Sequence, residues 1–279
     1  MIKDSTPTAP GRQVAGQAAR PTVAVPHTSV RGATMIEDLA DQTALVTGAT
    51  AGIGRASALL LAERGAHVIV HGRDRHRAAD TLRRIETLGG HARFEPADLS
   101  HPAEVTALAE RAGDIDILVN NAGVFHFART ADTDQATFEA HININLRAPY
   151  LLVQALAPAM VRRGHGVIIN ISSGAATTPG LGTGVYGASK AALESLTRAW
   201  AAEFGPAGVR VNAVAAGPTR TEGTAAFGDA FEAVGKAVAL QRVADAEEIA
   251  GAVAFLASGA ASYVNGTTLS AMGGMPALG

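Results

Sequence analysis

The alternation of short apolar runs with longer amphipathic stretches constrains the fold of this 279-residue chain most strongly. The short runs have strand length; they cover residues 43–47, 67–71, 92–96, 116–120, 166–172 and 209–215. The stretches between them have a helical period; they cover residues 53–64, 75–88, 102–112, 138–163, 186–204 and 247–257. Continuous β-branched runs separated by helices are typical of buried parallel strands in βαβ units. We therefore predict an α/β fold with a doubly wound parallel sheet.

The chain is predicted to contain one domain behind a tail. Residues 1–38 are rich in Pro, Gly, Ala, Ser and Thr without an apolar period, which predicts a flexible N-terminal tail. A second methionine, Met35, lies just before the ordered pattern, so the tail is either a genuine extension or a result of the choice of start site. Between Thr43 and Leu269 no linker-like break occurs. We expect residues 39–279 to form a single domain.

Composition excludes several classes of function. The net charge is −2, with acidic and basic residues interspersed, which disfavours nucleic-acid and anionic-membrane partners. The absence of cysteine excludes disulfides and thiolate chemistry, and the 9 histidines show no metal-ligand spacing, so no metal site is expected. No apolar run reaches the roughly 18 to 20 residues that span a bilayer. These features predict a soluble, cytoplasmic protein.

A glycine-rich segment, TGATAGIG at Thr47–Gly54, follows the first predicted strand and opens a helix. Gly48, Gly52 and Gly54 would let the backbone turn tightly and approach a pyrophosphate at the helix N-terminus. The alternative is a plain tight turn without a ligand. The strand, turn and helix order favours a nucleotide site.

A tyrosine and a lysine stand four residues apart in VYGASK, at Tyr186 and Lys190. On a helix this spacing puts both side chains on one face. An ammonium about 4 Å from a phenol contributes around 4 kcal/mol at an effective dielectric of 20, or roughly three pKa units. We therefore expect Lys190 to lower the pKa of Tyr186 into the range of an acid–base catalyst. The alternative is a chance pairing.

These motifs together resemble the short-chain dehydrogenase/reductase family. TGATAGIG, NNAG at Asn120–Gly123, a serine after a strand and YGASK occur in that family's order, and the likeness runs from about Asp41 to Gly274. The resemblance implies a Rossmann-type sheet, an NAD(P)-binding catalytic domain at residues 39–279 and hydride transfer at a carbonyl or alcohol carbon. The catalytic residues that it implies are Asn145, Ser173, Tyr186 and Lys190.

Two of these residues have neighbouring rivals. Ser172 and Ser173 face opposite sides of a strand, and the family's serine lies 13 residues before its tyrosine, which selects Ser173. Asn145 is preferred over Asn143 because the family's asparagine is followed by a leucine. In the family this asparagine helps to hold a water that relays protons to the lysine. Taken singly, the serine could be a strand-end cap and the asparagine a partner in a helix bend.

The resemblance also implies a set of cofactor-binding residues. They are Gly48, Thr50, Gly52, Ile53, Gly54, Arg73, Asp98, Leu99, Asn121, Ala122, Gly123, Tyr186, Lys190, Gly217, Pro218, Thr219 and Thr221. Gly72 stands where many relatives carry an aspartate for the ribose 2′-hydroxyl, and Arg73 follows it. A guanidinium can pair with a 2′-phosphate, which favours NADP. NAD stays possible because Asp74 is close and Arg73 could be a solvated arginine.

The family pattern is altered at two positions. Ala216 replaces a proline before the nicotinamide-facing loop, and Met272 replaces an aspartate near the C-terminus. The first change leaves that loop less rigid, and the second bears on assembly more than on catalysis. The resemblance implies a homotetramer or a homodimer.

The substrate is predicted to be a small-molecule carbonyl or alcohol compound. Residues 124–127, 177–184 and the loop 221–240 would line its pocket without a charged anchor that demands a charged substrate, which favours small or aliphatic carbonyl compounds. The chain is most similar in general to 3-oxoacyl carrier-protein reductases, so ketone reduction with NADP(H) is the leading prediction. The alternatives are an NAD-dependent alcohol or sugar dehydrogenase and a noncatalytic nucleotide-binding regulator.

Overall fold

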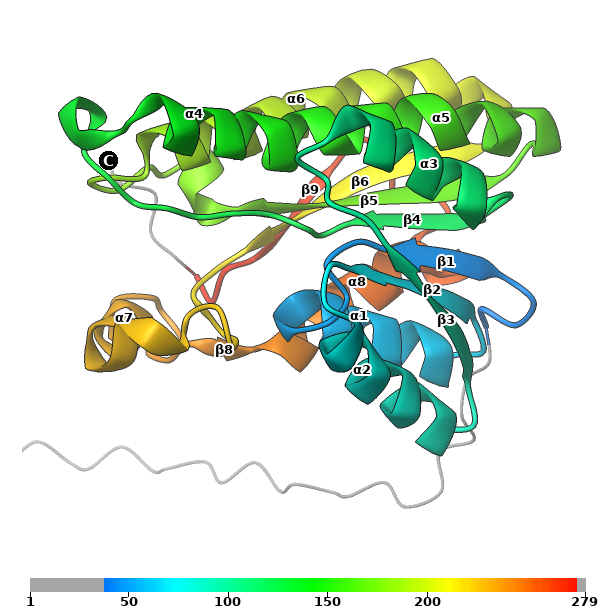
Figure 1. The fold of residues 1–279 in the computed structure, drawn as a ribbon, viewed down its shortest axis with the longest axis horizontal. Helices are drawn as coiled ribbons and strands as arrows, with labels where there is room; N and C mark the ends of the chain where they lie inside the picture. The colour runs from blue at the N-terminus through cyan, green and yellow to red at the C-terminus, as the bar shows by residue number, and fades with distance from the viewer. Residues whose placement is uncertain (1–37, 275–279) are drawn as a thin grey trace, which may run out of the picture. The chain divides into compact units, whose positions relative to one another are not determined.

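A central sheet of seven parallel strands organises the protein (Figure 1). The computed structural model describes residues 38–274, so the expected tail at residues 1–38 lies outside them apart from Asp38. The strand order is β3-β2-β1-β4-β5-β6-β9. The strands are β1 (Thr43–Val46), β2 (His67–Gly72), β3 (His91–Pro96), β4 (Ile117–Asn120), β5 (Gly166–Ser173), β6 (Val209–Ala216) and β9 (Thr268–Ala271). The predicted Rossmann-type fold is thereby confirmed.

Helices cover both faces of this sheet (Figure 1). One face carries α1 (Gly52–Glu63), α2 (Arg75–Thr87) and α8 (Ala246–Ala257). The other face carries α3 (Pro102–Ala112), α4 (Gln135–Ile142), α5 (Ala148–Arg163) and α6 (Gly184–Phe204). None of the helices within residues 38–274 is both long and apolar enough to cross a membrane.

The central strands are apolar throughout because successive side chains enter two different cores. In β1, Ala44 and Val46 pack with α1 and α8, whereas Leu45 packs with α3 and α5. In β4, Val119 packs in the core with α1 and α8, whereas Leu118 packs in the core with α3 and α5. Each strand is therefore buried on both faces, as parallel sheets covered by helices require.

The strand order reverses between β1 and β4. The chain runs outward from β1 to β2 and β3, then crosses back to place β4 against the other edge of β1. In such sheets ligands bind beyond the carboxyl ends of the strands at this switch point. The glycine-rich segment after β1 and Asn121–Gly123 after β4 both lie there.

Four features differ from the sequence prediction. Segment 221–240 is not one loop, because it contains α7 (Gly228–Lys236). A short parallel pair, β7 (Thr219–Arg220) with β8 (Ala244–Asp245), brackets that segment. The single helix predicted at residues 138–163 starts earlier, at Gln135, and is interrupted by a π-helical turn at Asn143–Arg147. The edge strand β9 was not predicted.

Candidate active site

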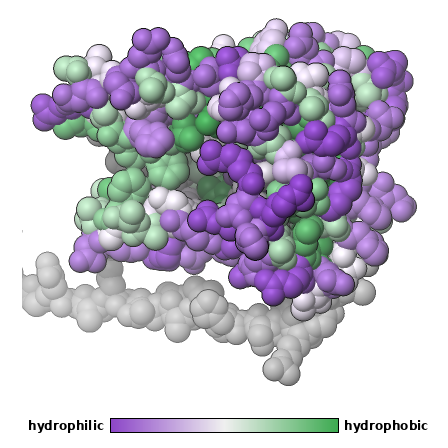
Figure 2. Space-filling view, viewed as in Figure 1, coloured by the Kyte–Doolittle hydropathy of each residue, from purple (hydrophilic) through white to green (hydrophobic). Residues whose placement is uncertain are grey.

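A cleft of about 900 Å³ opens at the carboxyl ends of the strands. In Figure 2 the molecular surface is hollowed between α7 and the helices on the opposite side of the cleft, and apolar side chains gather beside the opening. The predicted site residues that line the cleft are Gly48, Thr50, Gly52, Ile53, Gly54, Arg73, Asp98, Leu99, Asn121, Ala122, Gly123, Ser173, Tyr186, Lys190, Gly217, Pro218, Thr219 and Thr221. Asn145 lies just behind this lining.

The glycine-rich segment forms a tight cradle at the start of α1. Gly48 and Gly52 have φ angles of +65° and +51°, which side-chain-bearing residues rarely adopt. A Cβ at Gly54 would overlap the Gly48 carbonyl oxygen and the Asn121 amide. These glycines therefore let a ligand approach the backbone closely at the start of α1. The pyrophosphate of a dinucleotide is a ligand that needs such a close approach.

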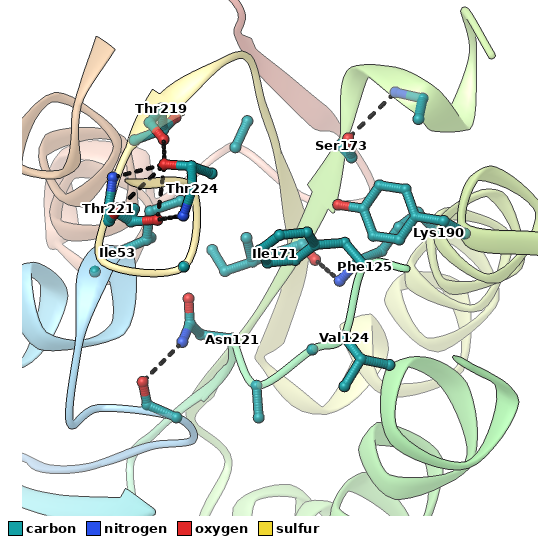
Figure 3. A pocket seen from close by; sticks show the side chains of 18 of the residues that line it. Ile53, Asn121, Val124, Phe125, Ile171, Ser173, Lys190, Thr219, Thr221 and Thr224 are labelled. Atoms are coloured by element: carbon teal, nitrogen blue, oxygen red, sulfur yellow. Dashed lines mark hydrogen bonds between the residues drawn. The ribbon is translucent and has the colours of Figure 1, made fainter. Parts of the chain in front are cut away.

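Asn121 and Thr47 brace this cradle against β4. The Asn121 side-chain amide donates to the Thr47 carbonyl oxygen at 2.8 Å. The Thr47 hydroxyl accepts from the Asn121 and Ala122 backbone amides, both at 3.0 Å. The Asn121 side chain thus supports the glycine segment, and the Asn121–Gly123 backbone edges the cleft (Figure 3).

His71, at the end of β2, is a structural residue that sequence reasoning left among the unassigned histidines. Its Nδ1 accepts from the Gly48 backbone amide at 3.2 Å, so Nε2 carries the hydrogen that is donated to the Ala97 carbonyl oxygen at 3.2 Å. Burial lowers the pKa of His71 to about 4. The neutral ring therefore ties the glycine segment to the strand ends that carry Arg73 and Asp98.

The end of β2 has no carboxylate facing the cleft. A Cβ at Gly72 would come within 2.5 Å of the Thr50 methyl group, so a larger residue does not fit there unless Thr50 moves. Asp74 caps α2 by accepting from the His76 amide at 2.8 Å and the Arg77 amide at 3.2 Å, and these bonds hold its pKa below the usual value. Arg73 is exposed and lines the cleft.

Ser173, Tyr186 and Lys190 meet on one side of the cleft. Ser173 ends β5, while Tyr186 and Lys190 lie one turn apart near the start of α6. The Ser173 hydroxyl lies close enough to the Tyr186 phenol to lower its pKa, and it accepts from the Ala175 backbone amide at 3.2 Å. Ser172 faces the opposite way and donates to the Glu194 carboxylate at 2.6 Å in the core. The structure thus brings Ser173 and not Ser172 to the phenol.

The electrostatics of this group differ from the sequence prediction. Burial raises the pKa of Tyr186, and the nearby Ser173 hydroxyl opposes this only in part. The expectation that Lys190 brings the pKa of Tyr186 toward neutrality is therefore wrong for this structure. The reason is that desolvation of the phenol is the largest influence on its pKa. Lys190 is also buried, which lowers its own pKa to about 8, and its Nζ donates to the Ile171 carbonyl oxygen at 2.8 Å (Figure 3).

Asn145 lies in the π-helical turn and connects α6 to the strand end after β4. Its Oδ1 accepts from the Val124 amide at 2.8 Å, and its Nδ2 donates to the Val124 carbonyl oxygen at 2.9 Å and to the Ser189 hydroxyl at 3.1 Å. A Cβ at Gly123 would lie 3.2 Å from Asn145 Oδ1 and 3.4 Å from Lys190 Nζ, so the three residues are neighbours. π-Turns inside helices are frequent at functional sites.

The loop after β6 closes the far side of the cleft. The Gly217 amide donates to the Ala271 carbonyl oxygen at 3.0 Å, and a Cβ at Gly217 would meet the Met272 Cα at 2.7 Å. Thr219, Thr221 and Thr224 form a hydrogen-bonded cluster beside the loop (Figure 3). The backbone of β9 therefore supports this loop at the altered positions Ala216 and Met272.

Glu222 is a second residue that sequence reasoning missed. Its carboxylate accepts from the Gly52 amide at 2.9 Å and pairs with Arg55. The contact joins residues 170 positions apart, and no local pattern indicates it. It links segment 221–240 to the start of α1.

An aromatic cluster stands over Tyr186. Phe127 meets the Tyr186 ring edge to face at a centroid distance of 5.7 Å, and Phe227 stacks on Phe127 at 6.1 Å. Behind them, the buried His141 packs against Tyr186 and accepts from the His126 amide at 3.1 Å. Aromatic side chains thus wall one end of the cleft.

The chain is similar to one protein-family model, to known proteins and to solved structures over most of its length. A family model described as enoyl-(acyl carrier protein) reductase matches residues 48–276. An uncharacterized oxidoreductase of Thermotoga maritima is 35% identical over 243 residues, which cover 84% of this chain and 97% of that protein. A solved structure described as a short chain dehydrogenase/reductase family protein is 51% identical, with a TM-score of 0.80, over 85% of this chain and 98% of that chain.

A further solved structure, a 3-oxoacyl (acyl-carrier-protein) reductase from Agrobacterium tumefaciens C58, has NADP bound. It is 33% identical, with a TM-score of 0.82, over 89% of this chain and 100% of that chain. The residues that the family model matches include the cleft-lining residues from Gly48 to Thr221, with Tyr186 and Lys190 among them. The chain therefore belongs to the short-chain dehydrogenase/reductase family.

Proposed function

We propose that the protein reduces a ketone with NADPH and that Tyr186 donates the proton. Family membership makes it an NAD(P)-dependent oxidoreductase acting on carbonyl or alcohol groups. The observation that carries the proposal is the meeting of Ser173, Tyr186 and Lys190 in the same cleft as the glycine cradle. This arrangement places side chains that can hydrogen-bond a substrate carbonyl oxygen beside the glycine cradle, where a dinucleotide would bind.

Each polar side chain has a role that follows from its chemistry. The cofactor supplies the hydride when it is bound. The Ser173 hydroxyl holds the substrate carbonyl oxygen, and the Tyr186 phenol donates a proton to that oxygen as negative charge develops on it. Lys190 would hold the ribose of the bound cofactor. Asn145 positions the Val124 segment and the water path to Lys190.

The protonation state of Tyr186 supports the reductive direction. Burial raises its pKa, so the phenol stays protonated throughout the neutral range. A protonated phenol can act as the acid that reduction needs, whereas alcohol oxidation needs a base. The noncatalytic alternative gives no chemical reason for three such groups to meet.

The surroundings of β2 support NADP(H) over NAD(H). Asp74 already caps α2, and Gly72 leaves no carboxylate for a ribose 2′-hydroxyl. Arg73 lies beside the cleft, where it can bind a 2′-phosphate. The NADP-bound relative is consistent with this choice. A homotetrameric or homodimeric assembly and a cytoplasmic location remain predictions.

Steady-state assays with purified protein test this function. We expect oxidation of NADPH by a panel of ketones, at a rate that exceeds oxidation of NADH at equal concentrations. The reverse assay, secondary alcohols with NAD⁺ and NADP⁺, tests the alternative directly. Turnover of sugars or simple alcohols with NAD⁺ and no ketone reduction with NADPH would favour the alternative dehydrogenase.

A further inference from the structure

We propose that the substrate carries an uncharged, flat apolar group, such as an aryl ring, close to its reacting carbonyl. Phe125, Phe127, Phe227 and Phe231 would form the subsite for that group. The inference rests on the proposed function and adds the substrate class. It replaces the expectation of small or aliphatic carbonyl compounds, because that expectation considered each lining segment of the sequence separately.

Half of the chain's 8 phenylalanines gather at this end of the cleft. Phe125 and Phe127 follow β4, while Phe227 and Phe231 come from the segment around α7, on the other side of the opening. Phe125 lies 6.3 Å from Phe227, and Phe227 lies 6.1 Å from Phe231, measured between ring centroids. The two walls therefore approach each other through their rings.

The rings are available to a ligand. Phe127 is 50% exposed and Phe227 is 39% exposed, although both face the cleft. Exposed large apolar side chains that face a cavity are typical of binding sites. A substrate group that packs against the exposed parts of these rings would cover apolar surface that water now contacts.

The subsite starts at the proton donor. The Phe127 ring contacts the Tyr186 ring edge to face, so a carbonyl within reach of the phenol has its nearer substituent beside Phe127. Aromatic rings favour offset or edge-to-face contacts at centroid distances of 4.5 to 7 Å. An aryl substituent can make such contacts with Phe127 and Phe227 together.

The charges along the cleft argue against an anionic substrate. Among residues 38–274, the Asp, Glu, Lys and Arg side chains that line it are Arg73, Asp98 and Lys190. Arg73 and Asp98 follow β2 and β3, several strands away from Ser173 on β5. Lys190 is buried against Ile171. A substrate carboxylate at the aromatic end would therefore lie without a cation to pair with it.

Four methyl ketones of matched reactivity test the inference. Phenylacetone, cyclohexylacetone, butanone and (4-carboxyphenyl)acetone are compared by kcat/KM with NADPH. We expect phenylacetone to exceed butanone at least about tenfold through apolar burial and to exceed cyclohexylacetone by about three- to tenfold through ring contacts. We expect (4-carboxyphenyl)acetone to fall below phenylacetone. Equal values for phenylacetone and butanone, or a preference for the carboxylate, would overturn the inference.

Variants locate the effect in the proposed subsite. Phe127→Leu and Phe227→Leu should lower the ratio of phenylacetone to butanone at least about threefold while the KM for NADPH stays constant. Phe255→Leu serves as the matched control, because Phe255 is 40% exposed on α8 outside the cleft lining. The same ratio in all three variants and the wild type would contradict the assignment.

A binding measurement separates this inference from the proposed function. Saturation-transfer NMR in the presence of NADP⁺ reports contact of phenylacetone with the protein without turnover. We expect transfer to the phenyl protons, reduced in Phe127→Leu. Transfer without reduction of any ketone would support the subsite and refute the proposed function. Reduction of butanone without phenyl transfer would support the function and refute the subsite.

Discussion

At the scale of single residues, Lys190 connects the fold to the chemistry. It is buried between α6 and the end of β5, and its Nζ donates to the Ile171 carbonyl oxygen at 2.8 Å. This burial lowers its pKa from 10.5 to about 8. Because the phenol of Tyr186 has a raised pKa, Lys190 is the member of the pair that titrates closer to neutrality.

This pKa predicts a pH limb in the reductive reaction. The Lys190 ammonium is present below pH 8 and is lost as pH rises through 8, so kcat/KM for ketone reduction should then fall about tenfold per pH unit. Lys190→Arg keeps its charge throughout this range, and its residual activity should lack the limb. A limb at the same pH in Lys190→Arg would show that another group titrates.

Arg73 gives the prediction for cofactor preference. We expect wild type to prefer NADPH, and we expect Arg73→Ala to lower the NADPH to NADH ratio of kcat/KM by about 10- to 100-fold, as the loss of a charge-assisted phosphate contact implies. Arg75→Ala is the control, because Arg75 is an exposed neighbour that stacks over Phe94 instead. An unchanged ratio in Arg73→Ala would remove this residue from the cofactor site.

At the scale of elements, the contact between the β6 loop and β9 supports the cofactor side of the cleft. Gly217→Ala should destabilise the protein by about 1 to 3 kcal/mol and raise the KM for NADPH, because its Cβ would meet the Met272 backbone at 2.7 Å. Gly251→Ala in α8 meets nothing within 4 Å and should stabilise by up to about 1 kcal/mol. Urea unfolding and NADPH titration check both variants, and equal unfolding midpoints would contradict the steric argument.

Most of the elements that the sequence predicts are those whose apolar side chains are buried in the two cores. The strands β1, β2, β4, β5 and β6 read as apolar runs because both of their faces are covered. The strand β3 is also predicted, although it lies at the sheet edge and is only partly buried. The edge strand β9 is only partly buried and pairs with β6 alone, so TLSA carries little apolar pattern. The helix α7 is mostly exposed and contains two glycines, which made segment 221–240 resemble a loop.

The candidate site also has one part that the sequence predicts and another part that it does not predict. The glycine segment and the Tyr186–Lys190 pair are local patterns, so the sequence predicts them. The brace from His71 to Gly48 and the contact from Glu222 to Gly52 join distant positions, and only the folded chain brings them together. The pKa of Tyr186 could not be derived from spacing either, because it depends on the burial of both side chains.

At the scale of the whole molecule, the surface of α4, α5 and α6 bears on assembly. Phe138 and Tyr150 are 49% and 47% exposed, and Tyr150 packs against Trp200 of α6. We predict a homotetramer, or at least a homodimer, that covers this apolar surface. Light scattering at micromolar concentration checks it, and Tyr150→Lys should shift the protein toward smaller species. A monomeric wild type would contradict the prediction.

The transfer of deuterium from labelled NADPH to a ketone tests the central claim most directly. Wild type is incubated with phenylacetone, or with butanone if that is the better substrate, and NADPH dideuterated at nicotinamide C4. We predict one deuterium on the carbinol carbon of each product molecule by mass spectrometry. We also predict that Tyr186→Phe forms almost no product while NADPH titration still shows binding. Product without deuterium, or full turnover by Tyr186→Phe, would contradict it.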